Sequence, residues 1–242
     1  MARGRPAEAR QEYEEALRLA HEVGAYAETP FLVARLAEVA YRTGDRSTAL
    51  TTLDEASAIG DQYGVPETRA FVKLMRAHIA LEDKDIARAS ELVDSVRGEI
   101  GQAPTPPQFT VMLNSIAAMV TAAESGPEHG LPLLVDTVRE AIEKRCSDVV
   151  VATLVDSVAV LLCDLGDVPR AVRLLAAAER WRGGDPRPHP ERVEVERAQA
   201  DARTGLGPVR YAAEHTRGTA LTPDAALAEL DEVVRARRVM NT

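Results

Sequence analysis

Apolar residues recur along this chain at the spacing of one helix face, and glycine, proline and short polar residues interrupt that spacing at regular intervals. The first such segment ends before Gly24, and a second begins at the Thr29-Pro30 pair, where a capping residue precedes a proline suited to the first helical turn. The pattern predicts helices at 5–22, 29–43, 46–60, 66–82, 86–98, 106–124, 128–145, 147–164, 168–182, 191–204, 207–217 and 222–238.

A turn followed by a small residue recurs about every forty residues. The small residues are Ala9, Ala49, Ala89, Gly130 and Ala171, separated by steps of 40, 40, 41 and 41 residues. A fixed period in this range is typical of stacked repeats, in which each unit buries its apolar face against the next. The sequence therefore predicts an array of helical hairpins with a surface for binding.

Residues at other positions of the repeat agree in size. The residue twelve positions earlier is Ala37, Ala77, Ala118 or Ala159, and the residue four positions later is Tyr13, Leu53, Val93, Leu134 or Leu175. This small and large spacing resembles the tetratricopeptide repeat over about residues 1–180, although the unit is longer and the signature tryptophan and proline are missing. The resemblance implies an all-α fold, a right-handed superhelix of antiparallel helical hairpins.

In that family the first helix of each hairpin lines a concave groove. The resemblance therefore implies a groove that binds a peptide, a protein domain or a small effector, with Arg42 or His78 fixing one end. The predicted groove residues are Phe31, Glu38, Tyr41, Arg42, Phe71, Leu74, His78, Glu82, Met112, Met119 and Asp156. The alternative is that the phenylalanines and methionines pack between hairpins.

The composition changes after the repeats. Residues 183–190 are rich in glycine and proline, which predicts a linker between repeats at 1–182 and capping helices at 191–242. Within 170–231, the runs Arg170 to Glu179, Leu206-Gly207 and Ala220-Leu221-Thr222 resemble the end of the helical-repeat region in actinobacterial SARP-type and LuxR-type transcriptional regulators. His215 replaces a tryptophan of that family.

This second resemblance implies the sensor or interaction segment of a regulator. It also implies a nucleotide-hydrolysing switch and a DNA-binding domain upstream in the same polypeptide. The first repeat contains only its second helix, so a further domain or a second subunit is expected to cover the exposed face of 5–22. A self-associating scaffold, such as a homodimer through this helix, is the alternative.

Charge and composition restrict the function further. A formal net charge of -9 argues against direct nucleic-acid binding, although Arg3-Gly4-Arg5-Pro6 matches the core of an AT-hook. No apolar run is long enough to span a membrane and no signal peptide is evident, so we expect a soluble, cytoplasmic protein.

Chemistry-bearing motifs are sparse. The sequence lacks a phosphate-binding Gly-x-x-x-x-Gly-Lys-Ser/Thr loop and a Gly-x-Ser-x-Gly nucleophile turn, and its five histidines are scattered. Cys146 and Cys163 have no nearby histidine, so they are expected to be packed thiols of a reducing compartment. We therefore expect no catalytic residues, no metal and no cofactor.

Overall fold

The computed structural model describes residues 6–100, 105–189 and 191–240, and these residues form eleven α-helices and one 3₁₀ turn, with no strand. The all-α prediction is confirmed at this level. The elements are α1 (Pro6–Glu22), η1 (Tyr26–Glu28), α2 (Thr29–Arg42), α3 (Arg46–Tyr63), α4 (Pro66–Glu82), α5 (Ile86–Ile100), α6 (Pro107–Ser125), α7 (Pro127–Glu143), α8 (Asp148–Asp164), α9 (Val168–Trp181), α10 (Glu191–Gly218) and α11 (Pro223–Met240).

The turns of the repeat share one backbone device. Gly44, Lys84 and Gly166 adopt positive φ angles of 89°, 61° and 81°, and each precedes an aspartate. The carboxylate of Asp45 accepts a hydrogen bond from the Thr48 amide, and Asp85 caps the next helix in the same way. A residue in the left-handed conformation therefore ends one helix at each of these turns, and at Asp45 and Asp85 the aspartate side chain also caps the next helix.

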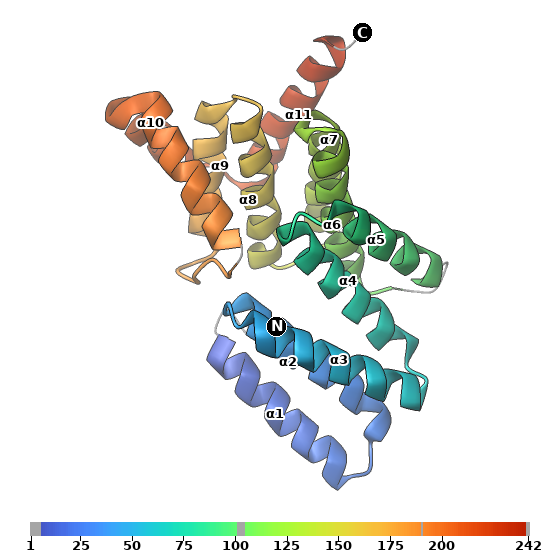
Figure 1. Ribbon diagram of the computed structural model, residues 1–242. Helices are drawn as coiled ribbons and strands as arrows, with labels where there is room; N and C mark the ends of the chain where they lie inside the picture. Colours follow the sequence, from blue (N-terminus) through green and yellow to red (C-terminus); the bar gives the residue numbers. More distant parts are fainter. Residues whose placement is uncertain (1–5, 101–104, 190, 241–242) are drawn as a thin grey trace. The chain divides into compact units, whose positions relative to one another are not determined.

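The chain divides into two compact units. The first covers residues 1–104 together with 188–190. In it, successive helices from α1 to α5 pack against one another, and α2 also contacts α4 (Figure 1). Its core contains the fully buried side chains Ala34, Ala37, Leu53, Ala56, Leu74, Ala77, Ala89 and Val96.

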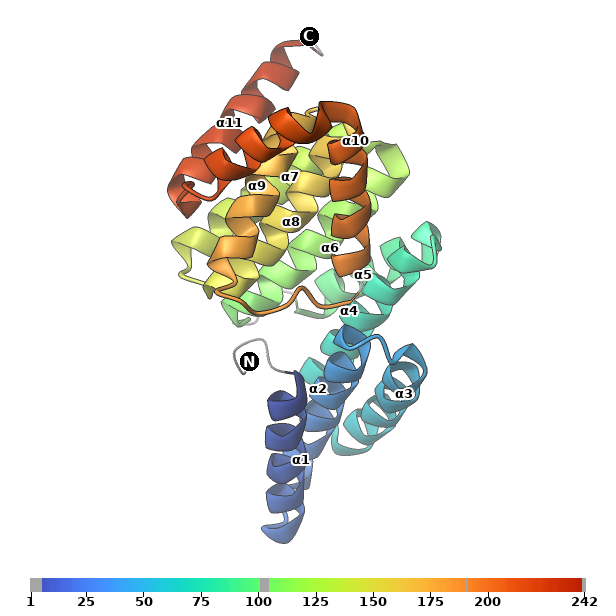
Figure 2. The same cartoon turned by 90° about the vertical axis from the view of Figure 1, so that its left-hand side faces the viewer.

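The second unit covers residues 105–187 and 191–242. The pairs α6–α7 and α8–α9 pack as hairpins, and Figure 2 shows α10 running along this helical layer. In this unit α10 contacts α9 and α8, while α11 contacts α7. The fully buried side chains Leu131, Leu134, Leu162, Leu174 and Leu230 belong to one continuous core.

The small residues at four of the repeat positions lie buried between helices. Ala49, Ala89 and Ala171 are fully buried, and a Cβ atom added to Gly130 would lie 2.5 Å from the backbone oxygen of Ala118. The period in the sequence thus reflects a requirement for small residues at helix crossings. The division into units falls between residues 104 and 105, with residues 188–190 assigned to the first unit. The predicted repeats at 1–182, linker at 183–190 and capping helices at 191–242 stay predictions. The right-handed superhelix stays a prediction.

Candidate functional site

Aromatic residues of the predicted groove pair within the first unit. The rings of Phe31 and Phe71 meet edge to face with centroids 5.7 Å apart, and those of Tyr41 and His78 do so at 5.4 Å. Phe71 and Tyr41 are buried, His78 is half-buried, and only Phe31, at 42% exposure, presents substantial area to solvent. These pairs therefore contribute mainly to packing between helices, and Leu74 lies wholly in the core.

The charged residues of the predicted groove are engaged in ion pairs. Glu38 is buried, with Arg35 at 2.6 Å and Arg42 at 3.6 Å from its carboxylate oxygens. Glu82 pairs with Arg46 at 3.2 Å. Arg42 and Glu82 keep partly exposed side chains, so their charges are neutralised locally but are not removed from solvent.

In the second unit, Met112 and Met119 are half-buried, and Met119 packs against the core. Asp156 is 1% exposed, and its carboxylate accepts hydrogen bonds from Arg182 at 2.8 Å and from Arg187 at 3.0 and 3.2 Å. This predicted groove residue therefore anchors to α8 the segment that comes after α9.

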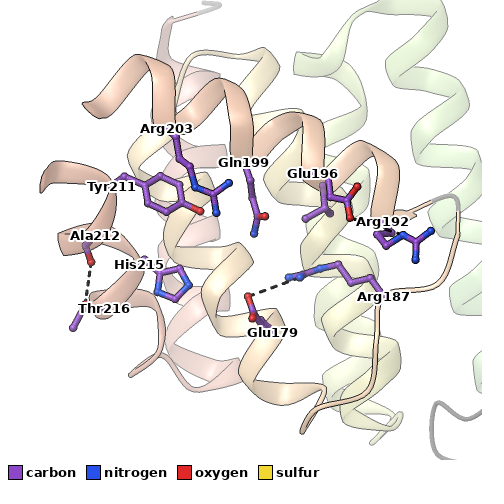
Figure 3. A pocket seen from close by; sticks show the side chains of 11 residues that line it. Glu179, Arg187, Arg192, Glu196, Gln199, Arg203, Tyr211, Ala212, His215 and Thr216 are labelled. Atoms are coloured by element: carbon purple, nitrogen blue, oxygen red, sulfur yellow. Dashed lines mark hydrogen bonds and ion pairs between the residues drawn. The ribbon is translucent and has the colours of Figure 1, made fainter. Parts of the chain in front are cut away.

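A pocket of about 560 Å³ opens in the second unit, on the surface predicted to be a cap. Its walls come from the end of α9, the following segment and both halves of α10, which face each other because α10 bends at Gly207 (Figure 3). The lining residues are Glu179, Arg187, Arg192, Val195, Glu196, Gln199, Arg203, Tyr211, Ala212, His215 and Thr216.

The bend depends on an angle that only glycine adopts readily. Gly207 has φ 71° and ψ 165°, and Pro208 follows it without an amide hydrogen to continue the first half of the helix. Residues 208–218 are then held against α9 by Arg173, whose guanidinium donates to Glu214 at 2.7 Å. That hydrogen bond lowers the pKa of Glu214.

The same arginine holds α11 in place. Arg173 also donates to Glu229 at 2.9 Å, and a Cβ added to Gly218 would lie 2.1 Å from the Arg173 carbonyl oxygen. Close packing and an ion-pair network together fix the wall of the pocket formed by residues 208–218.

The polar groups of the pocket differ in how they are compensated. Arg187 is committed to Asp156 and to the backbone oxygen of Leu175, with Glu179 at 3.9 Å. The guanidinium of Arg203 lies 4.8 Å from the ring centroid of Tyr211, which in turn stacks on His215 at 6.2 Å. Figure 3 shows Arg203, Gln199 and Glu196 in a row along α10, opposite Glu179 and Arg187.

Neither cysteine has the environment of a nucleophile. Burial raises the pKa of Cys163 to about 11, and burial also raises the pKa of Cys146.

Among the described residues, no group of three or more histidine, cysteine, aspartate or glutamate side chains is arranged to hold a metal ion. The described helices include none with the length and apolar character needed to cross a membrane. The AT-hook match at 3–6 lies almost wholly outside the described residues.

Sequence reasoning missed this pocket, and two signals could have indicated it. Gly205, Gly207 and Pro208 interrupt a polar, arginine-rich helix pattern, and the family resemblance singles out His215.

Comparisons of the chain with protein-family models, with curated proteins and with solved structures gave no match.

Proposed function

We propose that this chain is a non-catalytic, ligand-binding helical-repeat domain that acts in the cytoplasm as the sensor segment of a bacterial transcriptional regulator. The observation that carries the binding function is the pocket at the bend of α10, whose volume of about 560 Å³ falls within the range of about 300–1,000 Å³ of small-molecule sites. The regulator assignment is supported by the resemblance of residues 170–231 to the repeat region of such proteins.

The raised thiol pKa values argue against a cysteine nucleophile, since nucleophilic attack requires the thiolate. Occupation of the pocket would bring Arg187 and both halves of α10 into contact with one ligand. Because Arg187 also holds Asp156 of α8, a ligand that binds one arrangement of these elements better than another would shift their equilibrium.

The test is a thermal-unfolding screen with nucleotides, amino acids, sugars and organic acids against two matched variants. Ala212→Trp fills the pocket, whereas Ala213→Trp adds the same bulk at the next exposed position, which does not line it. A ligand at 100 times its Kd should stabilise the wild type and Ala213→Trp by about 2.7 kcal/mol. The proposal would be contradicted if a ligand stabilised Ala212→Trp as much as the wild type, or if no compound stabilised the wild type.

The regulator assignment has an independent test in the genomic reading frame. We expect the frame upstream of residue 1 to encode a Gly-Lys-Thr nucleotide site and a DNA-binding domain. When that switch domain is added in trans, it should bind the wild-type chain, as detected by titration calorimetry. A reading frame without these domains would eliminate the regulator role but would leave the binding function standing.

A second candidate function is self-association through the first unit. Large apolar side chains are exposed near the end of α1 and in η1, with Leu19 at 46%, Val23 at 76% and Tyr26 at 47% exposure. Tyr26 also stacks on Tyr63, which is 42% exposed, at 6.3 Å. Light scattering over a concentration series distinguishes the two functions, because a protein that remains monomeric at high concentration cannot be a self-associating scaffold.

A further inference from the structure

We propose that the pocket of the second unit recognises a small organic anion, a molecule whose carboxylate or phosphate group binds Arg203. This inference rests on the binding function proposed above and specifies the chemical class of its ligand. It follows from the charge, the partners and the shape of the side chains that line the pocket.

Arg203 is the cation that the pocket leaves without a carboxylate partner. Its side chain is exposed and makes no ion pair within residues 6–100, 105–189 and 191–240. Its guanidinium lies over the face of Tyr211, 4.8 Å from the ring centroid. Stacking of this kind restricts the rotamers of an arginine while its N–H groups remain available in the fixed fork that matches carboxylate and phosphate oxygens.

The other two arginines of the pocket are already compensated. Arg187 donates to Asp156 and Leu175, and its third nitrogen lies 3.9 Å from Glu179. Arg192 has Glu196 at 3.9 Å. An incoming anion therefore gains most from Arg203, with the neutral Gln199 amide one turn away on the same face of α10.

The same distribution of charge disfavours a large polyanion. Glu196 lies beyond Gln199 along α10, Glu179 lies on the opposite wall, and the chain as a whole carries a formal charge of -9 (Figure 3). Nucleic acid needs a row of cations along its backbone, whereas a small molecule needs one well-placed arginine.

The remaining wall suits an uncharged body. Val195, Ala212 and the ring of Tyr211 supply apolar area beside Gln199 and Thr216. The volume of about 560 Å³ exceeds what an isolated phosphate or acetate ion would occupy. The ligand class is therefore an organic molecule that combines one anionic group with a largely uncharged, flat or compact body.

Calorimetric titration with two pairs of probes, each an anion and its neutral counterpart of similar shape, tests this inference and separates the two anion types. One pair is AMP and adenosine, and the other is indole-3-acetate and indole-3-acetamide. We expect the charged member of at least one pair to bind about tenfold or more tightly than its neutral partner. This preference should disappear in Arg203→Met and persist in Arg210→Met, which removes an exposed arginine of α10 outside the pocket.

The outcomes distinguish failure of the anion inference from failure of the pocket. Two results would overturn the anion inference and leave the binding function intact. In the first, charged and neutral probes bind the wild type equally well and Ala212→Trp abolishes the binding of both. In the second, Arg203→Met keeps the preference for the charged probe. Binding that Ala212→Trp leaves unchanged would overturn both. If neither pair binds the wild type while the thermal screen yields only uncharged ligands, the anion inference alone is wrong.

Discussion

Burial decides the reactivity of Cys163 at the residue scale. The thiol is partly enclosed by the core of the second unit and its pKa is raised to about 11, first by burial and then by the charge of Asp164. At pH 8 such a pKa leaves about one thiol in a thousand ionised, compared with about a quarter at the ordinary pKa of 8.5.

We therefore expect Cys163 of the folded Cys146→Ser variant to react with Ellman's reagent at pH 8 about 100-fold or more slowly than the unfolded chain. The rate should rise as the pH approaches 11, because the thiolate is the reactive species. Absorbance at several pH values measures this rate. Equal rates in the folded and unfolded chains would contradict the assigned environment.

Asp156 compensates two arginines in the interior of the second unit. Arg182 is 4% exposed, and its Nε and Nη1 atoms have no hydrogen-bond partner among the described residues. Replacement by asparagine would leave the charges of Arg182 and Arg187 without their shared counter-ion. We expect Asp156→Asn to lower the free energy of unfolding by about 3–5 kcal/mol in urea titrations.

Asp201→Asn is the matched control for this prediction. Its carboxylate is 70% exposed and lies 4.0 Å from Arg197, so its removal should change stability by less than about 0.5 kcal/mol. If the two variants were equally stable, Asp156 would not be the anchor that its geometry indicates.

At the scale of secondary-structure elements, close helix crossings depend on residues with little or no side chain. Gly130 of α7 approaches α6 so closely that an added Cβ would lie 2.5 Å from both the Ala118 carbonyl oxygen and the Ala122 Cβ atom. Gly130→Ala should therefore destabilise the protein by about 1–3 kcal/mol, measured by urea unfolding. Gly205→Ala, in α10, meets no atom within 4 Å and should instead stabilise by up to about 1 kcal/mol. Destabilisation of similar size in both would contradict the close α6–α7 approach.

Helix positions could be predicted from sequence because turn residues and apolar spacing are local signals. The predicted end of α3 at residue 60 fell short of its actual end at Tyr63. Gly60 continues the helix and, having no side chain, lets Thr68 pack against it, whereas Gly64 at φ 67° ends the helix. Groove residues were less predictable. Phe31 and Phe71 occupy the same position of the repeat, yet Phe31 is 42% exposed and Phe71 is 2% exposed, because the neighbouring helices cover only Phe71.

The pocket could not be predicted because it depends on the direction in which α10 turns. The sequence indicated a break between 204 and 207, but the angle that brings Tyr211 opposite Gln199 is set by Gly207 and by the Arg173 contacts with α10 and α11. These contacts join residues more than forty positions apart, and no local pattern encodes them. Local interactions therefore specify the helices, and tertiary contacts specify the site.

The whole molecule consists of two units, each with its own buried core. In helical arrays each element contacts mainly its neighbours, so a local loss of stability spreads through the adjacent helices before it reaches distant ones. A destabilised Asp156→Asn chain should therefore exchange its amide hydrogens unevenly. A loss of about 3 kcal/mol corresponds to exchange about 150-fold faster where opening breaks the contacts of Asp156.

Hydrogen exchange followed by mass spectrometry should show this acceleration in peptides of α8, α9 and α10, and unchanged rates in peptides of α2 and α3. Asp201→Asn provides the reference rates for a surface substitution in the same unit. Uniform acceleration in both units would mean that the chain opens as one cooperative block. In that case a ligand in the pocket would stabilise the helices of both units, whereas units that open independently would confine this stabilisation to the helices around the pocket.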